Sequence, residues 1–130
     1  KEGSDISIIA CGIMVKESLD AANILNKQGI KVRVVNMPTI KPIDKKIISD
    51  CFKKTKAIIT AEEHSIIGGL GGAVSEVIAD MPEKKLLKRI GVRDRFGQSG
   101  KPTELMKEYG LTAQDIAEAA EEMLHLNINT

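Results

Sequence analysis

The sequence of 130 residues contains few aromatic residues, and its charges nearly cancel. It has no tryptophan, and its aromatic residues are Phe52, Phe96 and Tyr109. A net charge of +1 gives no electrostatic reason to expect binding to nucleic acid or to an anionic membrane. Because no aromatics are interleaved with the basic residues around Arg89, we interpret that group as a solvated rim and not as an RNA-binding surface.

Long apolar segments and cysteine-rich patterns are also missing. No apolar run approaches the roughly twenty residues of a membrane-spanning helix, and no charged-then-apolar export signal opens the sequence. Cys11 and Cys51 are the two cysteines, and both lie in apolar patterns. We therefore expect two buried free thiols and a cytoplasmic protein. His64 and His125 lack the convergent partners of a metal site, so we expect no metal.

Strand-like and helix-like patterns alternate along the chain, which is typical of an α/β domain. The length suits one domain, which we place at residues 1–124, followed by a frayed tail at 125–130. The first residue is Lys1, and a strand pattern follows almost at once. We therefore expect a piece of a longer polypeptide.

Hydrophobic periodicity and terminal signals define the predicted elements. Asp44 is placed as an N-cap, Thr112 and Asp115 approximate a capping box, and Gly29 and Gly110 are placed to end helices. The predicted strands cover residues 6–11, 30–37, 57–61 and 86–92. The predicted helices cover residues 15–28, 45–54, 70–81, 102–109 and 113–124.

The run from Glu62 to Ala73 carries the most informative chemistry. Glu62, Glu63 and His64 end a predicted strand, and four glycines follow where a helix should begin: Gly68, Gly69, Gly71 and Gly72. The three polar residues could form an acid/base group, cap the following turn or form hydrogen bonds at an interface. We favour a role for the glycines in packing the helix N-terminus closely against the sheet or against a neighbouring subunit.

Dinucleotide binding is a weaker interpretation of the same glycines. The pattern begins as Gly69-x-Gly71, but its sixth position is Val74, and it follows the third predicted strand instead of the first. A phosphate loop ending in Gly-Lys-Ser or Gly-Lys-Thr is absent. Neither Ser65 nor Ser99 lies in a nucleophile-elbow motif. A stand-alone Rossmann-like module that binds an anion at the start of this helix stays as an alternative.

Three motifs in this order resemble the C-terminal domain of transketolase. They are the run from Glu62 to Ala73, the Asp-Arg-Phe-Gly-Gln-Ser-Gly stretch from Asp94 to Gly100, and the Tyr-Gly-Leu-Thr stretch from Tyr109 to Thr112. The resemblance covers nearly the whole chain, and the Phe-Gly-Gln-Ser-Gly stretch favours transketolase over its relatives. Deoxyxylulose-phosphate synthase and the β subunits of 2-oxo acid dehydrogenases share the domain and stay as alternatives.

The resemblance implies a three-layer α/β/α domain with a mixed, mostly parallel five-stranded sheet. The fifth strand would lie before Leu86 or within residues 91–96. It also implies a parent enzyme of the pentose phosphate pathway that transfers a two-carbon ketol unit between sugar phosphates. In that family, thiamine diphosphate and magnesium are held between the other domains of a dimer, and the cofactor supplies the difficult chemistry.

For this chain the resemblance implies an assembly role and no catalytic residue. The sequence lacks the Gly-Asp-Gly that opens the diphosphate-binding motif of the family, so we expect the chain alone to bind no cofactor and to be inactive. The expected partners are the remaining transketolase domains or subunit, within a homodimer. The expected interface or loop residues are Glu62, Glu63, His64, Gly68, Gly69, Gly71, Gly72, Asp94, Phe96 and Gln98.

Overall fold

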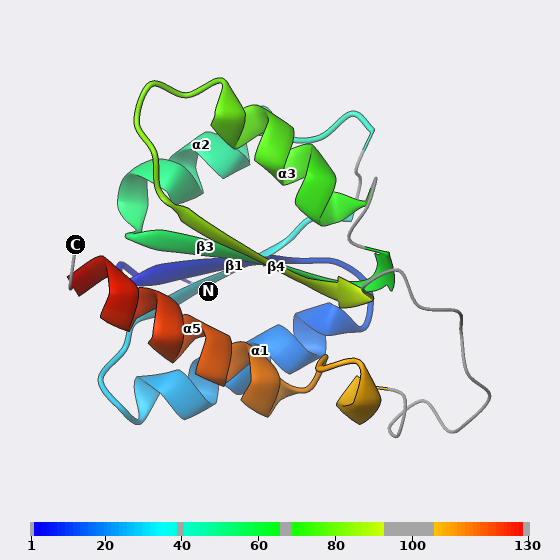
Figure 1. The fold of residues 1–130 in the computed structure, drawn as a ribbon, viewed down its shortest axis with the longest axis vertical. Coiled ribbons are helices and arrows are strands. Elements are labelled where there is room, and N and C mark those ends of the chain that lie inside the picture. The colour runs from blue at the N-terminus through cyan, green and yellow to red at the C-terminus, as the bar shows by residue number, and fades with distance from the viewer. Residues whose placement is uncertain (1, 39–40, 66–68, 93–105, 129–130) are drawn as a thin grey trace.

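Strands and helices alternate along the chain in the computed structural model, which describes residues 2–38, 41–65, 69–92 and 106–128 (Figure 1). The strands are β1 (Ile6–Ala10), β2 (Val32–Asn36), β3 (Ala57–Ser65) and β4 (Leu86–Val92). The main helices are α1 (Met14–Asn26), α2 (Lys45–Lys54), α3 (Leu70–Ala79) and α5 (Ala113–Ile128). The predicted α/β alternation is confirmed.

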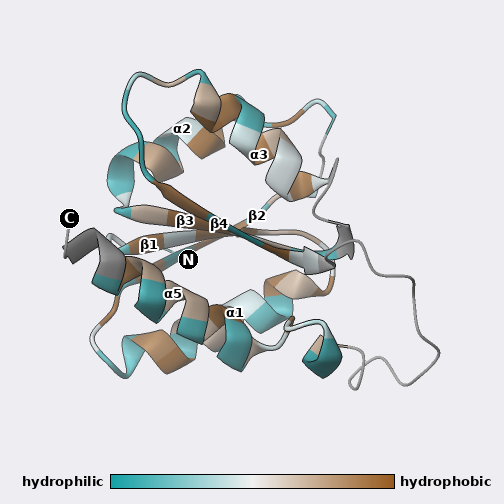
Figure 2. Cartoon of the chain, viewed as in Figure 1, coloured by the Kyte–Doolittle hydropathy of each residue, from teal (hydrophilic) through white to brown (hydrophobic). Residues whose placement is uncertain are grey.

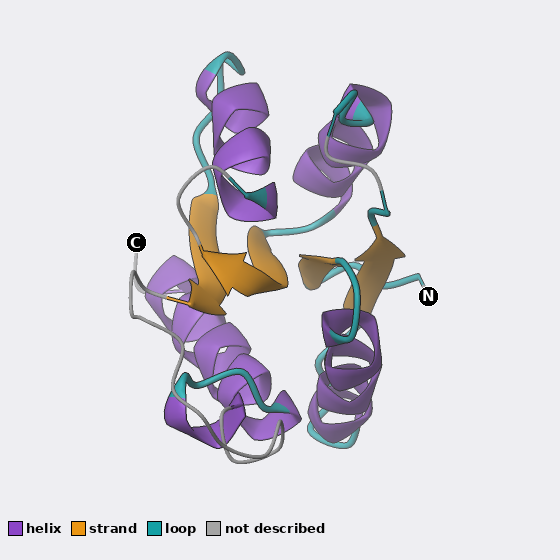
Figure 3. Cartoon of the chain, turned by 90° about the vertical axis from the view of Figure 1, so that its right-hand side faces the viewer, coloured by secondary structure: helices purple, strands orange, loops and turns teal. Residues whose placement is uncertain are grey.

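The sheet has the order β2-β1-β3-β4, and each neighbouring pair is parallel. Helices α1 and α5 cover one face and α2 and α3 the other, which gives three layers (Figure 1), and the turned view shows helices on both sides of the strands (Figure 3). The described residues form four strands and no antiparallel pair. No strand lies between α3 and Leu86, and the other predicted position of a fifth strand falls mostly outside the described ranges.

Two apolar clusters fill the space between the layers. Ile8 and Ile59 belong to the cluster under α1 and α5, whereas Ile9 and Ile58 belong to the cluster under α2 and α3. All four side chains are fully buried, as expected for a parallel sheet covered on both faces. Figure 2 shows the apolar character of the strands between more polar helices.

Local signals place several helix ends where the sequence predicts them. The Asp44 carboxylate accepts a hydrogen bond from the Ile47 amide at 3.1 Å, which caps α2. Gly29 and Gly110 have φ angles of 83° and 70°, a conformation that favours glycine. Before α5, Asp115 accepts from the Thr112 amide at 3.0 Å, and the Thr112 hydroxyl accepts from the Asp115 amide at 3.2 Å. The predicted capping box is confirmed.

Two details of the predictions are wrong. Helix α5 continues to Ile128, so it ends later than the predicted end at Leu124. Cys51 is fully buried, but Cys11 is only partly buried, because it follows the last residue of β1 at the carboxyl end of the strands. Both cysteines are free, as predicted.

Lys85 connects the start of β4 to the end of α2. Its ammonium group donates to the carbonyl oxygens of Phe52 and Thr55, the latter at 2.8 Å, and lies 4.9 Å from the centroid of the Phe52 ring. The last carbonyls of a helix have no partner within the helix, and a cation at that end is favourable. Lys85 is therefore part of the packing between α2 and the sheet.

Replacing Lys85 with methionine is expected to lower the free energy of unfolding by about 1–2 kcal/mol, because it removes these charge-assisted hydrogen bonds while keeping an unbranched apolar stem. Urea unfolding followed by circular dichroism measures the loss. Lys88→Met, at an exposed position of β4, is the matched control, and we expect it to change stability by less than about 0.5 kcal/mol. Equal effects of the two substitutions would contradict this role of Lys85.

Candidate functional site

The carboxyl ends of β1 and β3 lie side by side where the order of the strands changes direction. From β1 the chain adds β2 on one side, and β3 and β4 lie on the other. In open α/β sheets, ligands bind outside the carboxyl ends of strands at such a switch point. Cys11 and Gly12 follow β1, and Glu62 and Glu63 lie near the end of β3. The region at the carboxyl ends of β1 and β3 is therefore the candidate site.

Both glutamates lie in an irregular stretch of β3. Ala61 pairs with Ile90 and Ser65 pairs with Val92, so β3 has more residues than β4 between these two pairs. Such bulges re-aim side chains. Here Ala61 and Glu62 are both fully buried, whereas Glu63 is exposed.

The Glu62 carboxylate caps α3 from the neighbouring strand. Its side chain has no exposed surface; Oε1 accepts from the Leu70 amide at 2.8 Å, and Oε2 accepts from the Gly71 amide at 2.7 Å. The N-cap residue of α3 is Gly69, which has no side chain to serve this purpose. A carboxylate is favourable here because it satisfies unpaired amides and interacts with the positive end of the helix dipole. The chain's own carboxylate therefore occupies the position where α3 would otherwise bind an anion.

Gly71 lets the first turn of α3 approach the sheet closely. A Cβ at this position would lie 3.0 Å from Thr60 Oγ1 on β3, and 3.0 Å from both Cγ and Cδ of Arg89 on β4. The structure thus confirms close packing of the helix N-terminus against the chain's own sheet for this glycine. It also explains how the amides of Leu70 and Gly71 come within reach of Glu62.

Glu63 lies against the turn that follows β1. Gly12 has a φ of 61°, and a Cβ there would lie 3.1 Å from Glu63 Oε1. The pKa of the adjacent Cys11 thiol is raised, first by burial and then by the negative charges of Glu62 and Glu63. Because the thiolate is the reactive form, Cys11 is not an activated nucleophile.

Neutralising Glu63 is expected to lower the pKa of Cys11, since the nearby negative charge disfavours the thiolate. In Glu63→Gln, alkylation of Cys11 by iodoacetamide should therefore reach its half-maximal rate at a lower pH than in the unmodified chain. Mass spectrometry follows the modification, and buried Cys51 should be protected. Glu122→Gln, on the exposed part of α5, is the control. Identical pH profiles for the two variants would show that Glu63 does not act on Cys11.

The remaining predicted residues do not gather around this cluster in the part of the chain that is described. The backbone of His64 lies in β3, but its side chain is not among the described ones. Gly69 and Gly72 line an open depression between the start of α2 and α3, together with Lys45 and Glu76. Gly68, Asp94, Phe96 and Gln98 lie outside the described residues.

The described residues contain no group of three or more histidine, cysteine, aspartate or glutamate side chains arranged to hold a metal ion. Within the same ranges, no helix combines the length and the apolar character needed to cross a membrane.

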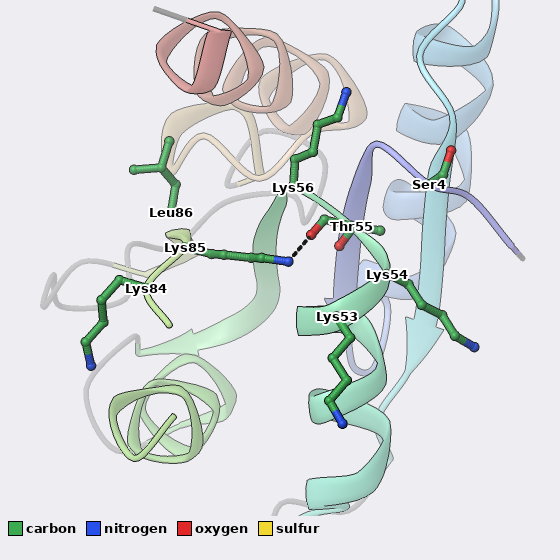
Figure 4. A pocket seen from close by; sticks show the side chains of 8 residues that line it. All are labelled: Ser4, Lys53, Lys54, Thr55, Lys56, Lys84, Lys85 and Leu86. Atoms are coloured by element: carbon green, nitrogen blue, oxygen red, sulfur yellow. Dashed lines mark hydrogen bonds between the residues drawn. The ribbon is translucent and has the colours of Figure 1, made fainter. Parts of the chain in front are cut away.

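A cluster of lysines at the opposite end of the sheet, where the strands begin, was not predicted from the sequence. Lys53, Lys54 and Lys56 precede β3, and Lys84 and Lys85 precede β4; all five line one pocket (Figure 4). A signal was present, because the starts of neighbouring parallel strands meet at one edge of a sheet. Each lysine stretch comes directly before a predicted strand.

Comparison with known proteins agrees with this architecture. The family model described as "Transketolase, C-terminal domain" matches residues 1–116. A putative transketolase C-terminal section of Methanocaldococcus jannaschii is 54% identical over 117 residues, which cover 89% of this chain and 36% of that protein. A 6-deoxy-6-sulfo-D-fructose transketolase subunit of Clostridium sp. is 45% identical, with 95% of this chain and 38% of that protein covered.

More distant relatives include proteins named for another activity. A 1-deoxy-D-xylulose-5-phosphate synthase of Heliobacterium modesticaldum is 38% identical over 95% of this chain and 19% of that protein. Among solved structures, one described as "Split gene transketolase, inactive beta4 tetramer" superposes on this chain with a TM-score of 0.91. The two sequences are 45% identical, and the match covers 98% of this chain and 41% of that chain.

The chain spans well under half of the length of each of these relatives. Such relatives are C-terminal sections of larger or split enzymes of the thiamine-diphosphate family. The match to the family model, the identities and the shared fold together show that this chain belongs to the transketolase C-terminal domain family.

Proposed function

We propose that this chain is the C-terminal part of a transketolase-like enzyme that transfers a two-carbon ketol unit between sugar phosphates, and that it serves assembly and scaffolding, not catalysis. The observation that carries this proposal is that Glu62 caps α3. Both of its oxygens bind amides of α3, and the side chain is fully buried. A carboxylate held in this way is not available to a substrate as a general base.

The described residues do not fit a site for thiamine diphosphate with magnesium. A diphosphate needs donors or a metal ion near it, and the N-terminus of α3 is filled by Glu62. No suitable group of metal ligands lies in the described ranges. We therefore propose that the remainder of the enzyme holds thiamine diphosphate and magnesium, and that this chain alone binds neither.

We further propose that the carboxyl edge of the sheet faces the other domains or subunit, within a homodimer. Gly12, Ile13 and Glu63 are exposed there, and Ile13 is an apolar side chain with 50% of its surface accessible. In this proposal Ile13 supplies an apolar contact to the interface, beside the charge of Glu63. The candidates outside the described residues, Asp94, Phe96 and Gln98, are proposed to join the same interface, as are His64 and Gly68.

The proposed setting is the pentose phosphate pathway in the cytoplasm. The free thiols of Cys11 and Cys51 support a reducing compartment.

Reconstitution tests the proposal. This chain is mixed with the matching upstream portion of its parent, and ketol transfer is assayed with thiamine diphosphate and magnesium beside each part alone. Activity in the mixture only is the expected result. Activity of this chain alone, or no activity after association has been confirmed by gel filtration, would contradict the proposal.

Three alternatives predict different outcomes. Because the chain is similar to 1-deoxy-D-xylulose-5-phosphate synthases, the mixture is also assayed for formation of 1-deoxy-D-xylulose 5-phosphate. A 2-oxo acid dehydrogenase β subunit would give neither product. A stand-alone anion-binding module would instead melt at a higher temperature with nucleotides or sugar phosphates. The Glu62 carboxylate at the start of α3 argues against that module.

A further inference from the structure

Five lysine side chains gather at the edge of the sheet opposite to Glu62, where β1, β3 and β4 begin (Figure 4). They come from the last turn of α2, the connection to β3 and the connection to β4. The whole chain carries a net charge of only +1, so this clustering of positive charge does not follow from its overall composition. The five are Lys53, Lys54, Lys56, Lys84 and Lys85, and the same pocket is lined by Ser4, Thr55 and Leu86.

Two of the five lysines are held by the backbone. Lys85 donates to carbonyls at the end of α2, as described above. The Lys84 ammonium donates to the carbonyl oxygens of Ala79 at 3.3 Å and Met81 at 3.5 Å, at the end of α3. The ends of two helices therefore fix two positive charges at this edge.

The other three lysines are exposed and nearly uncompensated. Lys56 lies 3.5 Å from Asp5 Oδ1, and its side chain keeps 58% of its surface exposed. Neither Lys53 nor Lys54 forms an ion pair with any described carboxylate. Like charges within about 10 Å repel each other at ordinary salt concentrations. An anionic partner would relieve this repulsion.

A small phosphate is a poor fit to this surface. The ammonium groups of Lys53, Lys54 and Lys56 extend in different directions and do not converge on one point (Figure 4). The nearby backbone presents the carbonyl ends of α2 and α3, whereas phosphate sites use amide donors at helix N-termini.

Nucleic acid is also disfavoured. Single-stranded nucleic acid binds to basic surfaces on which aromatic side chains stack with the bases. Phe52 is 5% exposed and lies beneath Lys85, and no aromatic residue lines the pocket.

A polypeptide segment with several carboxylates fits the separated charges better, because each carboxylate can pair with a different lysine. Leu86 is 39% exposed in the same pocket and offers an apolar contact. We propose that this lysine surface docks an acidic segment of a partner polypeptide. The surface lies at the edge of the sheet away from the interface proposed above, so its test is separate from the reconstitution experiment.

Binding of a fluorescein-labelled decaglutamate peptide tests the proposal, with decaglutamine as the neutral probe. Fluorescence anisotropy is measured with the full 130-residue chain and with the triple variant Lys53→Gln/Lys54→Gln/Lys56→Gln. The matched control is Lys16→Gln/Lys27→Gln/Lys107→Gln, which removes the same charge at exposed positions elsewhere. Circular dichroism checks that each variant is folded.

We expect the unmodified chain and the control variant to bind decaglutamate alike, and the triple variant to bind at least about tenfold more weakly, since each exposed charge pair contributes up to about 1 kcal/mol. Binding should weaken as salt is added, and decaglutamine should not bind. Equal losses in both variants, or no binding by the unmodified chain, would overturn the proposal. Tighter binding of tripolyphosphate or of a single-stranded oligonucleotide through the same lysines would overturn the assignment to a polypeptide.

Discussion

Replacing Glu62 with alanine is expected to lower the free energy of unfolding by about 3 kcal/mol, because two buried amides lose a charged acceptor and a cavity remains. In the folded chain, the Leu70 and Gly71 amides are bound by the two carboxylate oxygens at 2.8 and 2.7 Å. No hydroxyl or carboxylate at the N-cap can replace them, since that residue is Gly69. Urea unfolding monitored by far-ultraviolet circular dichroism measures the difference.

Two variants separate the cap from the general effect of substitution. Glu62→Gln keeps the size of the side chain but points an amide NH₂ at a backbone N–H, and we expect about half the loss, roughly 1–2 kcal/mol. Glu63→Ala removes the neighbouring, exposed glutamate and should change stability by less than about 0.5 kcal/mol. A Glu62→Ala protein as stable as Glu63→Ala would contradict the cap.

Replacing Gly71 with valine is expected to destabilise the chain by about 3 kcal/mol, by overpacking at the contact between α3 and the sheet. Even the Cβ alone would lie 3.0 Å from three atoms of Thr60 and Arg89, and valine adds two methyl groups to that Cβ. Gly71→Ala should cost less, about 1–2 kcal/mol. Thermal unfolding of the two variants gives the order of the effects.

A double-mutant cycle tests the cause. Arg89 contributes two of the three close atoms, and it is exposed, so Arg89→Ala alone should have a small effect. Combined with Gly71→Ala, it should recover at least about 0.5 kcal/mol, which is a measurable coupling between neighbouring residues. Strict additivity of the two substitutions would show that Gly71 is needed for some other reason.

The features predicted correctly from the sequence depend on residues close together in the chain. The N-cap Asp44, the capping box of Thr112 and Asp115, and the left-handed glycines Gly29 and Gly110 each act within one helical turn. Apolar periodicity was sufficient to find four strands, because a parallel sheet covered on both faces needs continuous apolar runs.

The features that could not be predicted depend on register and on contacts between distant segments. Glu62 and Glu63 are adjacent and chemically identical, but the first is fully buried and the second is exposed, and both lie where the register of β3 against β4 is irregular. From the sequence, capping was one of three possible roles for Glu62, Glu63 and His64. The position of α3 in the structure shows that Glu62 is the residue that caps it. The lysine surface likewise forms because the starts of β3 and β4 are neighbours in the sheet.

The position of Glu62 explains why we assign a structural role to the switch point between β1 and β3. Parallel α/β sheets usually offer this crevice to a ligand. Here Glu62 fills the anion position of α3, and the thiol of Cys11 is kept protonated by burial and by the adjacent negative charges, which raise its pKa. The edge is better suited to fixing the shape of the domain than to reacting with a substrate.

The most direct test of this account is the turnover number of the reconstituted enzyme with Glu62→Gln, expressed per assembled complex. The amount of complex is measured by gel filtration or ultracentrifugation in the same sample. If Glu62 is structural, the complex forms less readily or melts earlier, but kcat per complex stays within about threefold of the unmodified enzyme. A loss of about a hundredfold or more in kcat, with the complex intact, would place Glu62 in catalysis and contradict the assembly role.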